Sequence, residues 1–299
     1  MIGSAKKGTA LSILNESYTL ANGTRVPRLG LGTWLMDDAE AKGAVAAAVA
    51  AGYRMVDTAQ AYGNEAGVGE GVRACGVPRD QLFVGTKVAA ELKDHDSVAA
   101  SIDESLAKLG LDYVDQMIIH SPQPWAEVNQ SDDRHEEGNL AAWGALEEAQ
   151  AAGKVRVIGV SNFNEHDLAN IMDHASVKPQ VNQVLAHISN TPAELIDFCQ
   201  AHDILVEAYS PIAHGMVLAN PLVAEVAARY GVTPAQLCVR YCLQLGLLPL
   251  PKTSNPDHIA NNAQVDFQIS EEDMGLLRAA EHIKDYGDSS FFPVYGGKL

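Results

Sequence analysis

The feature that most constrains this chain is an alternation of short apolar segments rich in β-branched residues with longer, Ala-rich amphipathic segments. Such an alternation predicts βαβ units and a parallel sheet. Eight segments have strand character: 29–33, 54–58, 82–87, 114–120, 155–161, 180–186, 204–210 and 247–253. The clearest helical patterns between them are 38–51, 97–109, 139–152, 165–174 and 192–202, with Asp38 and Thr191 as expected N-caps. Eight units in 299 residues predict a closed (β/α)8 barrel of the α/β class.

The N-terminal region stands outside this repeat. Residues 18–26 predict a β-hairpin with Asn22-Gly23 in its turn, which would plug the barrel rather than join it. No low-complexity linker or composition shift divides the rest, so we expect a single barrel domain over residues 1–299. Residues 1–15 are expected to be a flexible extension.

An open dinucleotide-binding sheet is the main alternative fold. It would carry Gly-x-Gly-x-x-Gly between its first strand and helix. Gly30 and Gly32 supply only the first two glycines, and Gly67, Gly69 and Gly71 fall inside a helical pattern. The barrel is therefore favoured.

Charge and cysteine content restrict the class of partner. The formal net charge of -17 disfavours a phosphate backbone as ligand, so we expect a small-molecule partner and no nucleic acid. We find no signal sequence and no apolar run long enough to span a membrane, so the chain is expected in the cytoplasm and away from membranes. Four scattered cysteines agree with a reducing compartment. Cys238 and Cys242 are one helical turn apart, but no His cluster completes a metal site, so we expect them buried and no metal bound.

Polar residues gather where the predicted strands end. They are Asp57, Lys87, His120, Ser161, Asn162, Gln183, Tyr209, Ser210, Lys252 and Thr253. Singly, each has an ordinary structural explanation, such as a helix cap or a satisfied core histidine. Jointly they would meet at the C-terminal mouth of a barrel, which is where barrel enzymes build their active sites.

Three segments also carry a family resemblance. GYRMVDTAQAYGNEAGVG at 52–69, VIGVSNF at 157–163 and LPKT at 250–253 resemble the signature regions of the aldo-keto reductases. The resemblance runs from about Tyr18 to the C-terminus and is strongest to the bacterial branch that includes 2,5-diketo-gluconate reductases. It implies reduction of an aldehyde or ketone to an alcohol by hydride transfer from NADPH, in an enzyme that is usually monomeric.

The resemblance further implies a catalytic tetrad of Asp57, Tyr62, Lys87 and His120. Carbonyl reduction needs a hydride at carbon and a proton at oxygen. Tyr62 would supply the proton, and a neighbouring Lys87 ammonium is expected to lower its pKa from about 10. Asp57 would keep Lys87 charged, and His120 would orient the carbonyl oxygen.

The same resemblance implies the cofactor contacts. Ser161, Asn162 and Gln183 would hold the nicotinamide carboxamide, Tyr209 would stack on its ring, and Ser210 and Lys252 would contact phosphates. The complete set of expected cofactor residues is Gly32, Thr33, Asp57, Ser161, Asn162, Gln183, Tyr209, Ser210, Lys252, Thr253, Ser254, His258 and Asn262.

The segment expected to bind the adenosine part of the cofactor, residues 252–262, departs from the family pattern. Where relatives carry Arg and Glu, this chain has His258 and Asn261. An Arg holds a 2′-phosphate with a permanent charge, whereas His is mostly neutral at pH 7. We therefore expect NADPH to be used and NADH to be tolerated.

The segment expected to line the substrate pocket, which follows His120, also departs from the family pattern. Ser121 follows His120 where many relatives have Trp. Trp125 either folds back as that wall or packs within the loop that follows. Trp34, Phe291 and Phe292 are further candidates for pocket lining beside Tyr62 and His120, although the two phenylalanines could instead pin the tail to the barrel.

Two other functions remain as alternatives. A regulatory module could bind nicotinamide with little turnover, and a barrel lyase could use Lys87 as a Schiff base. The full tetrad disfavours the first, and Asp57 beside Lys87 disfavours the second. The sequence leaves sugars, keto esters, diketones and aldehydes open as substrates.

Overall fold

The structure is a computed structural model that describes residues 12–295. At its centre, eight parallel strands are hydrogen-bonded in sequence order. Gly30 N donates to Pro249 O at 3.2 Å and Gly32 N donates to Pro251 O at 3.1 Å, which joins the two edge strands. The predicted (β/α)8 barrel is confirmed. Its strands are β3 (Leu31–Gly32), β4 (Met55–Asp57), β5 (Phe83–Val88), β6 (Val114–Ile119), β7 (Val155–Ser161), β8 (Val181–Leu185), β9 (Leu205–Tyr209) and β10 (Leu248–Leu250).

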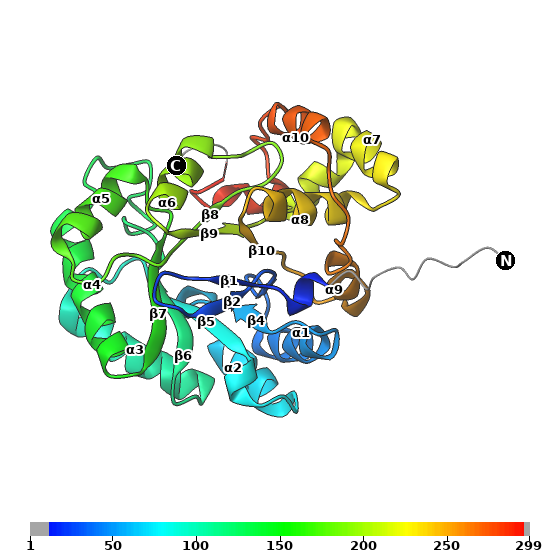
Figure 1. Ribbon diagram of the computed structural model, residues 1–299. Coiled ribbons are helices and arrows are strands. Elements are labelled where there is room, and N and C mark those ends of the chain that lie inside the picture. Colours follow the sequence, from blue (N-terminus) through cyan, green and yellow to red (C-terminus); the bar gives the residue numbers. More distant parts are fainter. Residues whose placement is uncertain (1–11, 296–299) are drawn as a thin grey trace.

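Helices surround this sheet, as Figure 1 shows. They are α1 (Asp38–Ala50), α2 (Glu65–Ala74), α3 (His95–Leu109), α4 (Glu136–Ala151), α5 (Glu165–His174), α6 (Ala193–Ala201), α7 (Pro221–Tyr230), α8 (Pro234–Gln244), α9 (Pro256–Asn262) and α10 (Glu271–Arg278). The strands are buried on both faces because they pack on the helices outside and on one another's side chains inside. This burial explains why their sequences are nearly continuous apolar runs.

The glycine pair once considered for a dinucleotide turn closes the barrel instead. A Cβ at Gly30 would lie 2.6 Å from Leu250 Cδ2, and one at Gly32 would lie 3.1 Å from Leu250 O. Glycine is needed at both positions because β3 approaches β10 closely.

Three glycines within α2 serve helix packing. A Cβ at Gly67 would collide with the backbone of Asp38, and one at Gly69 would collide with the backbone of Leu109. These glycines let α2 approach α1 on one side and the end of α3 on the other. The sequence pattern correctly predicted that these glycines lie inside a helix. The close helix contacts that require glycine are shown only by the tertiary structure.

Replacing Gly69 by Ala is therefore expected to destabilise the fold by about 1–3 kcal/mol, because backbone rather than a flexible side chain must move. Gly43→Ala is the matched control, since Gly43 is in helix α1 with nothing within 4 Å of its Cβ position. That substitution should stabilise the protein by up to about 1 kcal/mol. Urea denaturation of both variants measures the difference, and equal effects would contradict this account of α2.

Two expected helix caps are corrected. Asp37, not Asp38, caps α1, because its side chain accepts from the Glu40 amide at 2.8 Å. Asp38 lies within the first turn of α1, where its Oδ1 accepts from Gly67 N in α2 at 2.7 Å. Thr191 does not cap α6, whose N-cap is Pro192. The Thr191 hydroxyl bonds to His187 O and to Tyr241 Oη instead.

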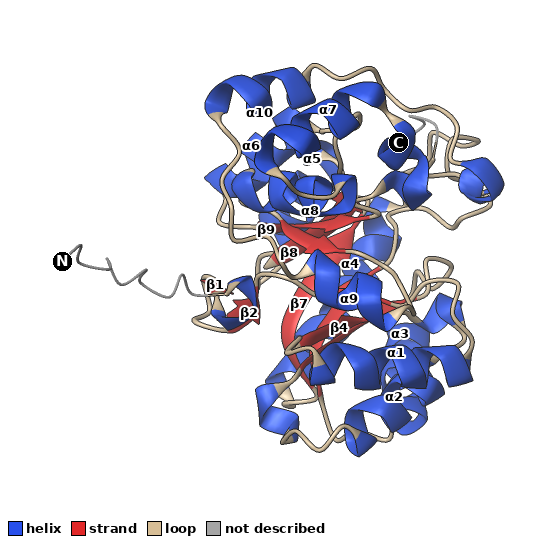
Figure 2. Ribbon diagram, turned by 90° about the vertical axis from the view of Figure 1, so that its right-hand side faces the viewer, coloured by secondary structure: helices blue, strands red, loops and turns tan. Residues whose placement is uncertain are grey.

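The N-terminal hairpin covers the bottom of the barrel. Strands β1 (Ser17–Thr19) and β2 (Arg25–Pro27) pair antiparallel, with Gly23 at φ +82° in the turn, and Figure 2 shows them at one end of the sheet. Leu20 and Val26 pack on barrel residues such as Phe83. Of the expected extension, residues 1–11 lie outside the described residues. Its last part is not free of the barrel, because Ile13 is 1% exposed and its amide donates to Asp266.

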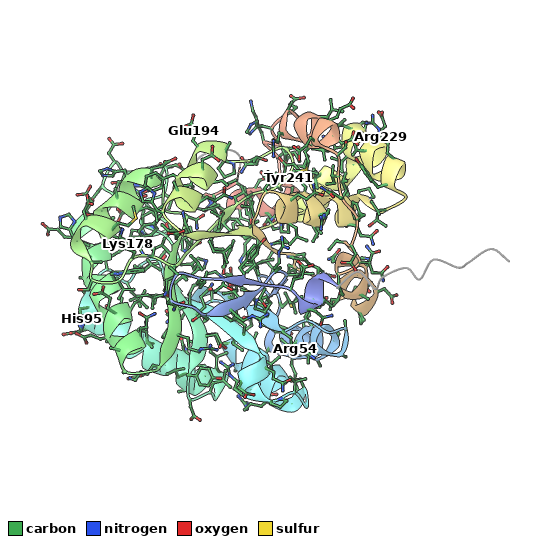
Figure 3. All side chains as sticks on the ribbon, viewed as in Figure 1. Arg54, His95, Lys178, Glu194, Arg229 and Tyr241 are labelled. Carbon is green, nitrogen blue, oxygen red and sulfur yellow. The ribbon has the colours of Figure 1, made fainter. Side chains whose placement is uncertain are left out.

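Charged side chains lie mainly on the outside of the helix ring, where Figure 3 places His95, Glu194 and Arg229. Cys238 and Cys242 are both fully buried, as expected, and are free thiols. Among the described helices, none combines the length and apolarity that crossing a membrane requires.

Candidate active site at the C-terminal mouth of the barrel

The ends of the barrel strands open into a cavity of about 770 Å³. Most residues expected for function line it. From the expected set these are Gly32, Thr33, Trp34, Asp57, Tyr62, His120, Trp125, Ser161, Asn162, Gln183, Tyr209, Ser210, Lys252, Thr253, His258, Asn262 and Phe292. They come from sequence positions more than 200 residues apart, and the barrel brings them together because every parallel strand ends at the same rim.

Lys87 is the buried centre of the site. Its ammonium donates to Asp57 Oδ2 at 2.6 Å, to Thr58 O at 2.8 Å and to Tyr62 Oη at 3.3 Å. These three acceptors use all of its protons. Burial lowers the pKa of Lys87, but Asp57 and Tyr62 outweigh that effect and raise it above its ordinary value. The ammonium is therefore retained at neutral pH.

Tyr62 presents a protonated hydroxyl to the cavity. Its oxygen accepts from Lys87, so its own proton is free to be donated elsewhere. Burial raises the pKa of Tyr62, and the Lys87 ammonium opposes that rise without cancelling it. This corrects the expectation of a lowered pKa: in the protein alone, burial has the larger effect, and Lys87 limits it.

His120 stands beside Tyr62, with ring centroids 5.6 Å apart. Burial, and then the Lys87 charge, hold the pKa of His120 well below its usual range. Its Nδ1 is buried and makes no hydrogen bond among residues 12–295. A buried orphan N–H is costlier than an orphan acceptor, so we place the single proton of the neutral ring on Nε2.

Gln183 is oriented by two carboxylates. Its Nε2 donates to Asp57 Oδ1 at 3.0 Å and to Glu207 Oε2 at 2.7 Å. Because the Asp57 carboxylate accepts and does not donate, the amide nitrogen must face it. Its Oε1 has no protein partner in the described part of the chain, and the residue lines the cavity. Gln183 thus offers a hydrogen-bond acceptor to a ligand.

Ser161, Asn162 and Tyr209 form a connected group at the neighbouring strand ends. Asn162 Nδ2 donates to His120 O at 3.0 Å, and Asn162 Oδ1 accepts from Tyr209 Oη at 2.8 Å. Ser161 Oγ donates to Gln183 O at 2.8 Å. Asn162 has a φ of 61°, a conformation that Asn tolerates better than most residues. The group fixes His120 and Tyr209 relative to each other.

The far end of the cavity carries few cations. Lys252 and His258 are both exposed there, and Asp257 lines the same end. His258 is in α9, whose N-cap Asn255 accepts from the backbone of Asp257 and His258. Ser254 was expected here, but it is exposed and does not line the cavity.

Aromatic rings form one wall of the cavity. Trp125 folds back from its loop, with its ring 5.0 Å from His120 and 4.7 Å from Phe292. Phe292 in turn lies 5.5 Å from Trp34. Of the two arrangements considered for Trp125, the folded-back one is observed.

Two expected wall residues are corrected. Ser121 is fully buried and does not line the cavity, because its hydroxyl accepts from Gln123 N while its carbonyl accepts from Lys93. Phe291 is 73% exposed and also does not line the cavity, since it points away from the wall that its neighbour Phe292 joins.

Several lining residues were missed by sequence reasoning. His214 and Tyr295 both bond to the Ser210 hydroxyl at 3.1 Å, which ties the loop after β9 to the C-terminal segment. His214 has a φ of 52°, so no regular pattern could have placed it. Glu207, which is fully buried and does not line the cavity, was also missed, although a single charged residue in an apolar strand two positions before Tyr209 was a usable signal.

Within the described residues, no group of three or more His, Cys, Asp or Glu side chains is placed to hold a metal ion. Asp57, Lys87 and Tyr62 are bonded to one another instead.

Comparisons with known proteins agree with one another. The model of the Aldo/keto reductase family matches residues 28–282. A glyoxal reductase of Bacillus subtilis is 38% identical over 268 residues, which cover 89% of this chain and 93% of that protein. A 9,11-endoperoxide prostaglandin H2 reductase of Trypanosoma cruzi is 38% identical over 282 residues, covering 92% of this chain and 95% of its own length. The crystal structure of a Bombyx mori aldo-keto reductase in complex with NADP has a TM-score of 0.82 at 31% identity, covering 94% of this chain and 99% of that one.

Proposed function

This chain belongs to the aldo/keto reductase family, and from that premise we propose how its own residues reduce a carbonyl. The observation that carries the proposal is the buried Lys87 ammonium, held by Asp57 at 2.6 Å and reaching at 3.3 Å the hydroxyl of Tyr62, which lines the cavity with His120. A nicotinamide cofactor supplies the hydride. The protein supplies the proton, the orientation of the carbonyl and a site shielded from water.

Tyr62 is the proposed proton donor. Its phenol is protonated at neutral pH, and the Lys87 ammonium beside its oxygen stabilises the phenolate that donation leaves behind. Asp57 keeps that ammonium charged and in place. A charged Lys87 with all three protons engaged is a poor nucleophile, which disfavours the Schiff-base alternative.

His120 is the proposed orienting group. Neutral, with its proton on Nε2, it donates to the carbonyl oxygen and holds it beside Tyr62. Trp34, Trp125 and Phe292 form an apolar wall on the same side of the cavity, which suits the body of an organic carbonyl compound. The substrate class stays open among sugars, keto esters, diketones and aldehydes.

The remaining cavity residues fit a nicotinamide nucleotide. Gln183 Oε1 is an acceptor without a protein partner, which matches the NH₂ of a carboxamide. Ser161, Asn162 and Tyr209 lie beside it, while Ser210 and Lys252 lie toward the end where phosphates would be held. A panel of carbonyl compounds, assayed by loss of reduced-nicotinamide absorbance, tests the function. Absence of turnover with every compound and both cofactors would refute it.

The residues at the end of the cavity that would bind adenosine should discriminate only weakly between NADPH and NADH. Among residues 12–295, Lys252 and His258 are the cations that line this end and are available for a 2′-phosphate, and the Asp257 carboxylate opposes one. An Arg contact to phosphate contributes about 1.5–3 kcal/mol, so His258→Arg is expected to raise the NADPH preference by about tenfold or more. Steady-state kcat/KM with NADPH and NADH measures this. A wild-type preference above about a thousandfold would contradict the proposal.

We also propose that the enzyme works as a monomer in the cytoplasm. The free thiols of Cys75, Cys199, Cys238 and Cys242 suit a reducing compartment. Sedimentation of the purified protein tests the monomer, and a stable dimer would overturn it.

A further inference from the structure

A buried carboxylate beneath the cavity takes no part in the chemistry just proposed. Glu207, in β9, is 0% exposed and lies two residues before Tyr209, so both side chains point into the barrel. Its Oε2 accepts from Gln183 Nε2 at 2.7 Å and from Gln116 Nε2 at 3.0 Å. Its Oε1 is buried without a hydrogen-bond partner in the described part of the chain. Such an arrangement is costly unless a positive charge compensates it.

Within residues 12–295, no cation contacts Glu207 to supply that compensation in full. Lys87 is the cation of this cluster, and its three protons go to Asp57, Thr58 and Tyr62 rather than to Glu207. The adjacent strand β8 and the more distant strand β6 bring the neutral amides Gln183 and Gln116 to Glu207, and the other adjacent strand, β10, brings Leu248, Pro249 and Leu250. With two carboxylates and one ammonium, the cluster has one net negative charge when Glu207 is ionised. Burial, followed by the charge of Asp57, raises the pKa of Glu207 to about 7.

Resting on the proposed function, we propose that Glu207 is a positioning residue whose charge favours the oxidised, cationic nicotinamide over the reduced, neutral one. Gln183 links it to the cavity, because one amide nitrogen contacts Glu207 and Asp57 while its oxygen faces the ligand side. Hydride transfer moves two electrons and one hydrogen to the carbonyl carbon, Tyr62 protonates the oxygen, and the ring is left with a positive charge. An ionised Glu207, held against the Gln183 amide that would bind the nicotinamide, would stabilise that product and the charge that develops towards it.

The affinity for NADP⁺ should depend on pH through Glu207. Below pH about 7 the free protein carries Glu207 mainly as the neutral acid. NADP⁺ favours the ionised form and so lowers this pKa, releasing a proton on binding. Affinity for NADP⁺ should therefore rise as pH increases towards about 7 and level off above it, whereas NADPH should lack this component. The ratio of the two dissociation constants cancels titration at the adenosine end, including the 2′-phosphate, Lys252 and His258.

The test measures dissociation constants of NADP⁺ and NADPH for the full chain between about pH 5.5 and 8.5. Trp34 and Trp125 line the cavity, so quenching of intrinsic fluorescence reports binding without turnover. For the wild type, the ratio of the NADP⁺ to the NADPH dissociation constant should fall by on the order of tenfold across this range. Calorimetry of NADP⁺ binding near pH 7, in buffers of different ionisation enthalpy, should show proton release.

Glu207→Gln removes the charge and keeps the geometry. Its amide oxygen can replace Oε2 as acceptor for Gln183 and Gln116, while its NH₂ occupies the position where Oε1 is unpaired now. In this variant, the ratio of the NADP⁺ to the NADPH dissociation constant should be independent of pH. Its value should be near the one that the wild type shows at low pH. Glu207→Asp, which keeps the charge, should retain the pH dependence. Glu65→Gln is the matched control, because Glu65 is also buried but accepts from Thr86 rather than from the Gln183 network.

The outcomes separate the two proposals. A pH-independent ratio in the wild type overturns the role of Glu207, and so does an unchanged pH dependence in Glu207→Gln. An equal loss of affinity for NADP⁺ and NADPH in Glu207→Gln would mean that Glu207 only supports Gln183. That result would also overturn the proposed role of its charge. If Glu207→Gln does not fold, the wild-type ratio and Glu207→Asp still decide. If the wild type binds neither nucleotide, the proposed function itself fails.

Discussion

Replacing Tyr62 by Phe is expected to lower kcat for carbonyl reduction by about 10²- to 10⁴-fold, the usual contribution of a positioned proton donor. The ring keeps its volume, and Lys87 keeps its bonds to Asp57 and Thr58, so the fold should be preserved. NADPH affinity should change little, because no residue proposed to hold the nucleotide relies on the Tyr62 hydroxyl. Steady-state kinetics and nucleotide binding on the same preparation measure both quantities.

The control for Tyr62→Phe is Tyr230→Phe. Tyr230 donates its hydroxyl to Asp273 in α10, outside the cavity, so losing it should cost stability but not turnover. Unchanged turnover in Tyr62→Phe would reject Tyr62 as the acid. It would also revive the regulatory nicotinamide-binding module, for which a proton donor is unnecessary.

Replacing Lys87 by Met should impair stability as well as activity. Asp57 is 4% exposed and would lose its ammonium partner, leaving Gln183 Nε2 as its side-chain donor. Breaking one side of a buried ion pair typically costs about 3–5 kcal/mol, because the remaining charge is uncompensated. Tyr62 would lose the cation that stabilises its phenolate, so turnover should fall at least as far as in Tyr62→Phe. Urea denaturation and steady-state kinetics measure the two losses.

Two further variants separate the causes in Lys87→Met. Lys42→Met removes an exposed lysine whose pair with Glu70 is on the surface, and it should change stability by less than about 1 kcal/mol. The double variant with Asp57→Asn removes the stranded charge, so it should regain part of the stability but none of the activity. A Lys87→Met protein within about 1 kcal/mol of the wild type would show that the pair does not hold the site together.

Local patterns predicted the elements well where burial alone sets them. The strand at 155–161 and the helix at 165–174 have the predicted bounds, since a fully buried strand and a one-sided helix leave clear apolar periods. Caps were less predictable. Asp37 and Asp38 are adjacent and chemically equal, and only the approach of α2 decides that Asp38 bonds to Gly67.

The same limit applies to the candidate site. Ser121 and Phe291 were expected in the cavity because of their sequence neighbours, but loop conformation turned one into the interior and the other into solvent. The sequence allows two packings for Trp125, and contact with the C-terminal Phe292 selects one of them. Loops lack a periodic pattern, so the direction of their side chains depends on tertiary neighbours.

The sequence by itself determined the order of the strands, their ends and therefore which polar residues share the mouth of the barrel. That follows because parallel strands with short connections must end at one rim. Only the tertiary structure decided which of those residues touch. The Gln183 amide nitrogen in β8 donates to both Asp57 and Glu207. Asp57 is in β4, more than 100 residues before Gln183 in the sequence, and Glu207 is in β9, which follows β8. Contacts across a barrel depend on strand stagger and side-chain rotamers, and neither is encoded in a local pattern.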